Sequence, residues 1–159
     1  MIVNKESSNK IDLETLTGKW FIYKINFPMW LKGDKENPSL NYSLIKKENE
    51  TILFDEVLYT KNNKIKSIKG YDIPQNKNNT SFKWKGKGIL ALLSSKWKFV
   101  YLNLENEWAI IFFEKTLFTP KGYDVISKNK TMESSILTDI DSKLKKLGIF
   151  DLLQNIKQV

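Results

Sequence analysis

Acid–base chemistry in this chain would fall to carboxylates, lysine or tyrosine, because the side chains that most often perform it are missing. The sequence contains no histidine and no cysteine, which removes the commonest general base, the thiol nucleophile and the usual metal ligands. Asp55 and Glu56 are adjacent acidic residues, but they lie in a predicted strand, where neighbouring side chains point to opposite faces. We therefore expect no catalytic dyad, no metal site and no cofactor, and an enzyme is a minor alternative.

Lysine supplies all 26 basic residues and gives a formal net charge of +8 at pH 7. This charge indicates either an anionic partner, such as nucleic acid or a membrane surface, or simply a lysine-rich solvated surface. The segment Lys83-Trp84-Lys85-Gly86-Lys87 mixes basic and aromatic side chains, as platforms that stack nucleic-acid bases do. Arginine, the preferred reader of phosphate and guanine, is absent, so we expect no specific nucleic-acid partner.

Short runs of aromatic and β-branched residues, separated by turn residues, predict eight strands. These cover residues 19–25, 40–46, 51–59, 64–73, 80–87, 96–104, 108–115 and 123–127. Spacing of roughly 8–12 residues with mostly short connections is typical of an antiparallel sandwich or barrel.

The hydrophobic period changes to a helical one after the last of these strands. A helix is expected over about 131–147, with Thr131 as its N-cap and Gly148 ending it. Its apolar stripe consists of Met132, Ile136, Ile140, Leu144 and Leu147. A final strand over 152–157 is also expected. The predicted fold is all-β: an eight-stranded antiparallel up-and-down β-barrel with one C-terminal α-helix packed on its outside.

A barrel of eight strands is either filled by side chains or holds one small ligand. Aromatic and lysine side chains alternate along 80–87 and 96–104, which predicts aromatic residues facing the interior. The candidate ligand-binding residues on the strands are Phe82, Trp84, Trp97, Phe99, Tyr101, Trp108, Ile110 and Phe112.

The segment after the first strand, 27–34, has an unusually apolar tip made by Met29, Trp30 and Leu31. Two interpretations stay open: these side chains tuck into the edge of their own core, or they form a lid over the mouth of a ligand cavity. Met29 and Trp30 are therefore further candidate ligand contacts.

Three sequence elements resemble the lipocalin family, nearest its bacterial and apolipoprotein-D-like branch. They are the G-x-W strand at Gly18-Lys19-Trp20, the acidic polar turn within 100–109, and the end of a strand at Tyr123-Asp124-Val125-Ile126-Ser127-Lys128. The resemblance covers residues 14–158, and Gly18, Trp20 and Lys128 would be structural. It departs from the family pattern where Lys128 replaces the arginine that packs over the strand tryptophan, and where the usual disulfide is missing.

The resemblance implies a non-catalytic protein that binds, and so transports or sequesters, a small hydrophobic ligand in the barrel. A fatty acid or lysophospholipid is the expected ligand, with Lys24 pairing with its head group. The alternatives are binding of nucleic acid or an anionic surface through the lysine and aromatic residues, or a lipocalin-like lipid isomerase or cyclase.

Residues 1–10 are expected to form a flexible tail and 11–159 a single barrel domain. No signal peptide is visible, so we expect a cytoplasmic protein, or a periplasmic or secreted one if a leader was removed. Peripheral membrane contact and a monomer or weak dimer are further expectations.

Overall fold

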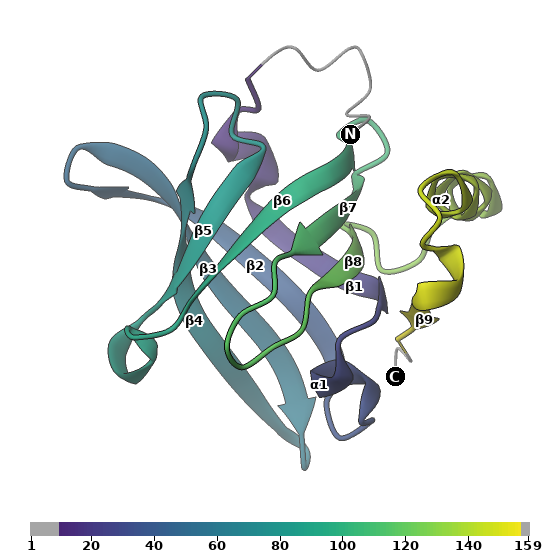
Figure 1. Ribbon diagram of the computed structural model, residues 1–159, viewed down its shortest axis with the longest axis horizontal. Coiled ribbons are helices and arrows are strands. Elements are labelled where there is room, and N and C mark those ends of the chain that lie inside the picture. The colour runs from purple at the N-terminus through teal and green to yellow at the C-terminus, as the bar shows by residue number, and fades with distance from the viewer. Residues whose placement is uncertain (1–9, 157–159) are drawn as a thin grey trace.

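Eight antiparallel strands close into a barrel in the computed structural model, which describes residues 10–156 (Figure 1). Each strand pairs with the next in sequence, β8 pairs with β1, and β1 pairs with β2 to close the ring. The strands are β1 (Gly18–Ile25), β2 (Glu36–Lys47), β3 (Glu50–Lys61), β4 (Lys64–Pro74), β5 (Ser81–Gly86), β6 (Ser94–Asn103), β7 (Trp108–Phe113) and β8 (Gly122–Ser127). The predicted fold class is confirmed.

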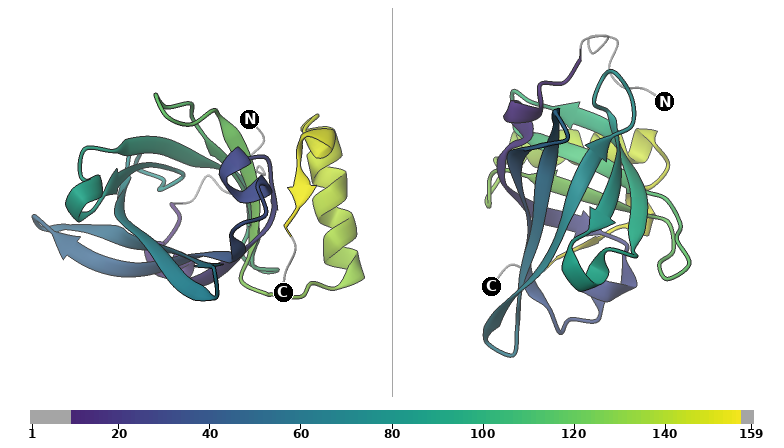
Figure 2. Two further views of the ribbon diagram at one scale, coloured as in Figure 1. Left: turned by 90° about the horizontal axis from the view of Figure 1, so that it is seen from below. Right: turned by 90° about the vertical axis from the view of Figure 1, so that its left-hand side faces the viewer.

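One helix, α2 (Ser134–Lys146), lies against the outside of the barrel (Figure 2, left). It begins later than expected, with Glu133 rather than Thr131 at the N-cap position. The final strand is also shorter than expected, because a 3₁₀ turn, η3 (Phe150–Leu152), leaves only β9 (Gln154–Asn155) to pair with β1. Lys157 and the expected tail over 1–9 lie outside the described residues.

Strand β2 starts before Asn37-Pro38, a dipeptide that is typical of turns. Asn37 has a positive φ of 50°, and the pairing with β3 shifts register between Glu36 and Ser39. The turn signal therefore marks a β-bulge inside a longer strand.

Buried apolar side chains form two layers. The first fills the barrel, includes Trp20, Leu53, Phe82 and Trp97, and is closed at one end by 3₁₀ helix η1 (Leu13–Leu16). The second lies between the barrel wall and α2, where Ile140 and Leu144 of the helix pack on the outer wall. The interior layer is the one that shapes a site.

The helices of the described part of the chain are short or polar. Within residues 10–156, none is long and apolar enough to cross a membrane.

Candidate functional site

The barrel interior contains a cavity of about 250 Å³ near one end. Residues from all eight barrel strands, from the segment after β1 and from the β7–β8 connection line it. They are Ile22, Phe27, Met29, Trp30, Leu40, Tyr42, Asp55, Val57, Ile68, Trp84, Ser95, Trp97, Phe113, Glu114, Thr119 and Asp124. Most of these side chains are apolar or aromatic, as in small-molecule sites.

Aromatic rings hold one another in place around the cavity. Trp97 stacks on Phe82 with ring centroids 4.5 Å apart, and Tyr42 lies parallel to Trp97 at 6.4 Å. Trp84 lies against the backbone of Gly70 on the neighbouring strand, where any Cβ would collide with the indole. Such packing gives rigid flat walls, because each ring is fixed by another ring or by backbone.

Three carboxyl groups are buried inside the barrel: Asp55 on β3, Asp72 on β4 and Asp124 on β8. Trp97 Nε1 donates a hydrogen bond of 2.7 Å to Asp72 Oδ1, and the Asp55 and Asp72 carboxyls share a hydrogen bond. One oxygen of each carboxyl has no hydrogen-bond partner. Such orphan oxygens are rare in native interiors and call for an explanation.

Burial raises the pKa of all three carboxyls. Loss of hydration raises the pKa of Asp124 well above its usual range, and the same cause acts on Asp55, where the charge of Asp72 adds to it. The pKa of Asp72 is raised to about 7, because burial outweighs the hydrogen bonds from Trp97 and Asp55. The pKa of Tyr42 is raised by burial and then by these three carboxylates, so the acids surround one phenol.

Among residues 10–156, no basic side chain lines the cavity. Asp55, Asp124 and Glu114 line it, whereas no lysine does. The chain as a whole carries a net charge of +8, so the acidic lining of the cavity contrasts with the excess of lysine over the rest of the protein.

The structure brings together four of the predicted ligand contacts as cavity lining: Met29, Trp30, Trp84 and Trp97. Phe82 and Phe99 also face the interior, where they pack against Trp97 as its second layer.

The other predicted contacts lie outside the barrel, which corrects the expected orientation. Tyr101, Trp108 and Ile110 belong to the layer beneath α2, and Phe112 packs on Tyr123 of the outer wall. A register shift between Phe99 and Tyr101 reverses which β6 side chains point inward, and β7 follows the opposite alternation from the one expected.

Lys24 is likewise on the outer wall and not at the mouth. A register shift between Ile22 and Lys24 turns its side chain out, where its Nζ lies 3.5 Å from Asp141 of α2. The ring of Phe150 covers it at 5.2 Å. Lys24 therefore ties the helix to the barrel and cannot reach a ligand in the cavity.

The apolar segment after β1 combines the two interpretations left open by the sequence. It folds into one helical turn, α1 (Pro28–Leu31). Trp30 is buried, lines the cavity and contacts the Tyr59 ring edge-on at 5.6 Å, whereas Met29 and Leu31 remain exposed. Asp34 fastens the following loop through ion pairs with Lys35 and Lys61.

The opposite end of the barrel is sealed by the G-x-W element. Gly18 has a φ of 104°, which favours glycine, and Trp20 Nε1 donates to Leu16 O at 2.8 Å. Lys128 Nζ lies 5.3 Å from the centre of the Trp20 ring and donates to Thr15 O. Lysine thus occupies the place over the tryptophan that the resemblance assigns to arginine.

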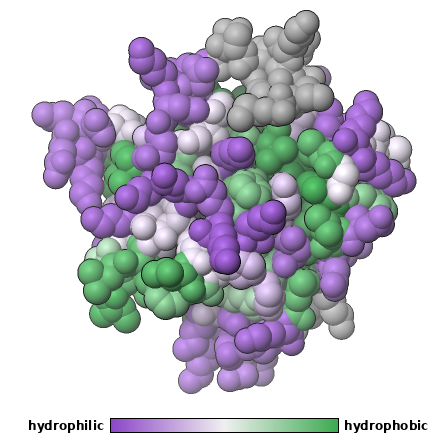
Figure 3. All heavy atoms as spheres, viewed as in Figure 1, coloured by the Kyte–Doolittle hydropathy of each residue, from purple (hydrophilic) through white to green (hydrophobic). Residues whose placement is uncertain are grey.

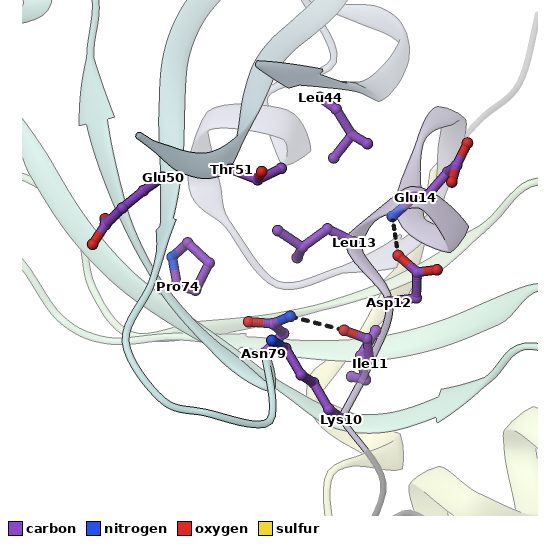
Figure 4. A pocket seen from close by; sticks show the side chains of 10 residues that line it. All are labelled: Lys10, Ile11, Asp12, Leu13, Glu14, Leu44, Glu50, Thr51, Pro74 and Asn79. Atoms are coloured by element: carbon purple, nitrogen blue, oxygen red, sulfur yellow. Dashed lines mark hydrogen bonds between the residues drawn. The ribbon is translucent and has the colours of Figure 1, made fainter. Parts of the chain in front are cut away.

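A second hollow, of about 660 Å³, lies outside this sealed end, beside the residues that lead into η1 (Figure 4). Its wall is more polar, and Asn79 closes one side by donating to Ile11 O at 2.8 Å. No buried side-chain atom without a partner lines this hollow among the described residues. The interior cavity is the stronger candidate site.

The proposed nucleic-acid platform is not assembled. Trp84 points into the cavity, while Lys83 and Lys85 point to solvent on the other face of β5. The tryptophan is therefore not available beside the lysines for stacking on bases.

Exposed apolar side chains gather at the open end of the barrel, the lower end in Figure 1. The most exposed are Ile65, at the start of β4, and four residues of the β5–β6 and β7–β8 connections: Ile89, Leu92, Leu117 and Phe118. Figure 3 shows such side chains at the lower left, over the β5–β6 connection. We call these five residues the apolar rim.

Sequence reasoning overlooked the buried carboxyl cluster. Asp55 was considered only with its neighbour Glu56, which points outward, 3.9 Å from Lys69 Nζ. The available signal was alternation: Asp55 shares its face of β3 with Leu53 and Val57, an apolar face, so its burial could have been inferred.

A closed eight-stranded antiparallel barrel, sealed at one end by a 3₁₀ turn and a tryptophan and flanked by one helix, belongs to the class of up-and-down β-barrels. No protein-family model matches the sequence, and no curated protein matches it significantly. Solved structures do match, and they show that the chain has the lipocalin fold. Insecticyanin from the tobacco hornworm Manduca sexta has a TM-score of 0.73 at 12% identity, covering 95% of this chain and 82% of its own.

Two further similar structures come from other arthropods. The cockroach allergen Per a 4 has a TM-score of 0.70 at 14% identity, covering 96% of this chain and 92% of its own. Lobster apocrustacyanin A1 has a TM-score of 0.66 at 9% identity, covering 92% and 79%.

Proposed function

We propose that this protein is a non-catalytic binding protein that holds one small, largely apolar ligand in the barrel cavity. The observation that carries the proposal is the 250 Å³ cavity itself, walled by rigid aromatic rings within a lipocalin fold. Burial of apolar ligand surface would supply the affinity, at about 25 cal/mol per Å². The bacterial branch and the compartment stay predictions.

The fatty acid or lysophospholipid expected from the sequence fits the cavity less well than a compact ligand. The expected partner of the lipid head group is Lys24, which lies under α2 beside Asp141. A carboxylate or phosphate in the cavity would instead meet Asp55 and Asp124 with no lysine beside them among the described residues, and a buried anion without a cationic partner is costly. The cavity is also at or below the lower end of typical pocket volumes, about 300 Å³.

Binding can be tested with the neutral fluorescent probe N-phenyl-1-naphthylamine. The fluorescence emission of the probe should increase when it binds the wild-type protein. Its affinity for the Val57→Phe variant should be at least tenfold lower, because the added ring fills the cavity. Leu58→Phe places the same ring on the next residue of β3, on the outer face, and should leave binding unchanged. Equal binding by all three proteins would locate the probe elsewhere and remove the support for this function.

A second proposal concerns the apolar rim: it rests on an anionic lipid surface, with the cavity mouth facing the lipid. Five large side chains exposed by 78% or more on three hairpins are costly in water. Lysines 66, 115 and 121 lie exposed near the same hairpins, and each basic residue near an anionic surface contributes about 1 kcal/mol.

Sedimentation with vesicles tests this contact. Wild-type protein should pellet with phosphatidylglycerol-containing vesicles and less with pure phosphatidylcholine. The pair Leu92→Ser and Phe118→Ser should abolish pelleting, whereas Leu104→Ser, at the sealed end, should not. Unchanged pelleting of the rim pair, or a dimer that only the rim pair dissociates, would overturn the proposal.

A further inference from the structure

We propose that the cavity selects a small organic amine, whose ammonium group is bound by the Asp55 and Asp124 carboxyls while its apolar or aromatic part packs among Trp30, Trp84 and Trp97. This inference rests on the proposed function, because it names the class of ligand that the same cavity would hold.

The first argument is the unused hydrogen-bonding capacity of the two carboxyls. Asp55 is 6% exposed and Asp124 is 3% exposed, and both line the cavity. The Oδ1 atom of each has no hydrogen-bond partner in the structure. A primary ammonium group brings three donors and no acceptor, so it is the complement of two carboxyl groups that each present a free oxygen.

The second argument is charge. Three acidic residues and no basic one line the cavity, and a third buried acid, Asp72, lies behind Asp55. A buried charge is tolerated when it is paired and hydrogen-bonded. An ammonium group would provide that pairing, whereas an anionic ligand would find no cation among the cavity-lining residues that the structure describes.

The third argument is the aromatic wall. Trp97 is fixed by stacking on Phe82 at 4.5 Å and by its hydrogen bond to Asp72, and Trp30 is fixed against Tyr59. Tryptophan faces attract cations and stack on flat apolar groups. Rings that cannot turn away present those faces to whatever enters.

The arrangement favours an organic cation over a metal ion. Within residues 10–156, no three histidine, cysteine or carboxylate side chains are placed to hold a metal. An amine with a ring or a short chain would instead fill the apolar part of the cavity and place its one charge beside the buried carboxyls.

Binding of this kind is linked to protons. The groups that face Asp55 and Asp124 are Tyr42 from β2, Asp72 from β4, the Trp97 N–H from β6 and Glu114 at the rim of the cavity, with no lysine among the cavity-lining residues. Burial favours the protonated form of Asp55 and Asp124 in the empty barrel, because it raises the pKa of each carboxyl. An ammonium ligand must displace at least one of these protons, so its affinity should rise from pH 5 to pH 8.

Isothermal titration calorimetry with three probes of one shape tests the inference: tryptamine as the cation, 3-ethylindole as the neutral form and indole-3-propionate as the anion. At pH 8, tryptamine should bind at least tenfold more tightly than 3-ethylindole, and indole-3-propionate most weakly. Titrations in buffers of different ionisation enthalpy should show proton release with tryptamine alone.

Asp55→Asn and Asp124→Asn should each weaken tryptamine at least tenfold and leave 3-ethylindole within twofold, which also shows that the variants fold. Glu56→Gln, on the outer face of β3, is the matched control and should change nothing. Equal affinity for all three probes, or tightest binding of the anion, would overturn the amine inference and leave the proposed function standing. If no probe binds and Val57→Phe does not alter N-phenyl-1-naphthylamine binding either, the proposed function itself fails.

Discussion

The barrel interior and the layer beneath α2 are both buried and rich in aromatic rings, yet they treat charge in opposite ways. Beneath α2, Lys24 pairs with Asp141 at 3.5 Å, and Lys143 Nζ lies 4.3 Å from the centre of the Tyr101 ring. In the interior, three carboxyls keep oxygens without a partner. The unpaired atom of the outer layer is only the neutral Trp108 N–H, among the described residues.

This difference separates two uses of buried polarity. A paired charge such as Lys24 fixes the position of an element. A set of unpaired carboxyls lowers stability and is retained in natural proteins where a site requires it. Buried polar groups without partners are therefore a better guide to the site here than aromatic content, which both layers share.

The largest effect should come from breaking the outer layer. Leu144 is fully buried between α2 and the barrel, so Leu144→Ala should lower the free energy of unfolding by about 4 kcal/mol. Urea denaturation measures this. Under conditions where the variant is fully folded, its affinity for N-phenyl-1-naphthylamine should not change. A loss of affinity would show that the two layers are coupled.

The pH dependence of stability should come from the interior. The pKa of Asp72 is 3.8 when unfolded and about 7 when folded, so the folded state binds its proton more tightly. The resulting stability is fully present below pH 4 and is lost as pH rises to 7, by about 4 kcal/mol at 1.4 kcal/mol per pH unit, of which Asp55 carries a share. Asp72→Asn keeps the acceptor for Trp97 and should flatten the profile; an unchanged profile would contradict this origin.

Replacing an unpaired interior acid should stabilise the protein. Asp124→Leu removes a buried carboxyl beside a cavity with room for the larger side chain, and we expect a gain of about 2 kcal/mol at pH 8. Thermal unfolding at pH 8 gives the sign. A loss of stability would mean that Asp124 has a partner in solution, most simply a bound ligand or water.

The smallest expected effect belongs to the paired lysine. Lys24→Gln removes an ion pair whose partner, the Asp141 side chain, is 42% exposed, so the cost should be about 1 kcal/mol. Binding of tryptamine and of palmitate, measured by calorimetry, should stay at wild-type values. Weaker palmitate binding would restore Lys24 as a head-group contact.

The sequence predicted the barrel well, because strand alternation and turn residues are local signals. It also predicted Trp30, Trp84 and Trp97 as cavity lining. It misplaced Lys24, Tyr101 and Ile110, because each prediction depends on which side chains of a strand point inward. Single-residue register shifts at 22–24 and 99–101 reverse that choice, and neither has a glycine to announce it.

The carboxyl cluster was beyond the local signals for a different reason. Asp55 is the cross-strand partner of Tyr42, and Asp72 lies on the neighbouring strand β4, but Asp124 of β8 comes close to Tyr42 only when the barrel closes through β1.

Gly70 gives the cavity a simple route to change. Because Gly70 has no side chain, the Trp84 indole can pack directly against β4. Any larger residue there would collide with the indole and, at 2.8 Å, with the backbone carbonyl oxygen of Lys85, so both the indole and β5 would have to move, while the acids that line the cavity would be unchanged. The residue that limits the size of the cavity is thus different from the acids that set its charge. Selectivity for ligand size could therefore evolve, or be engineered, by single substitutions that leave the charge preference unchanged.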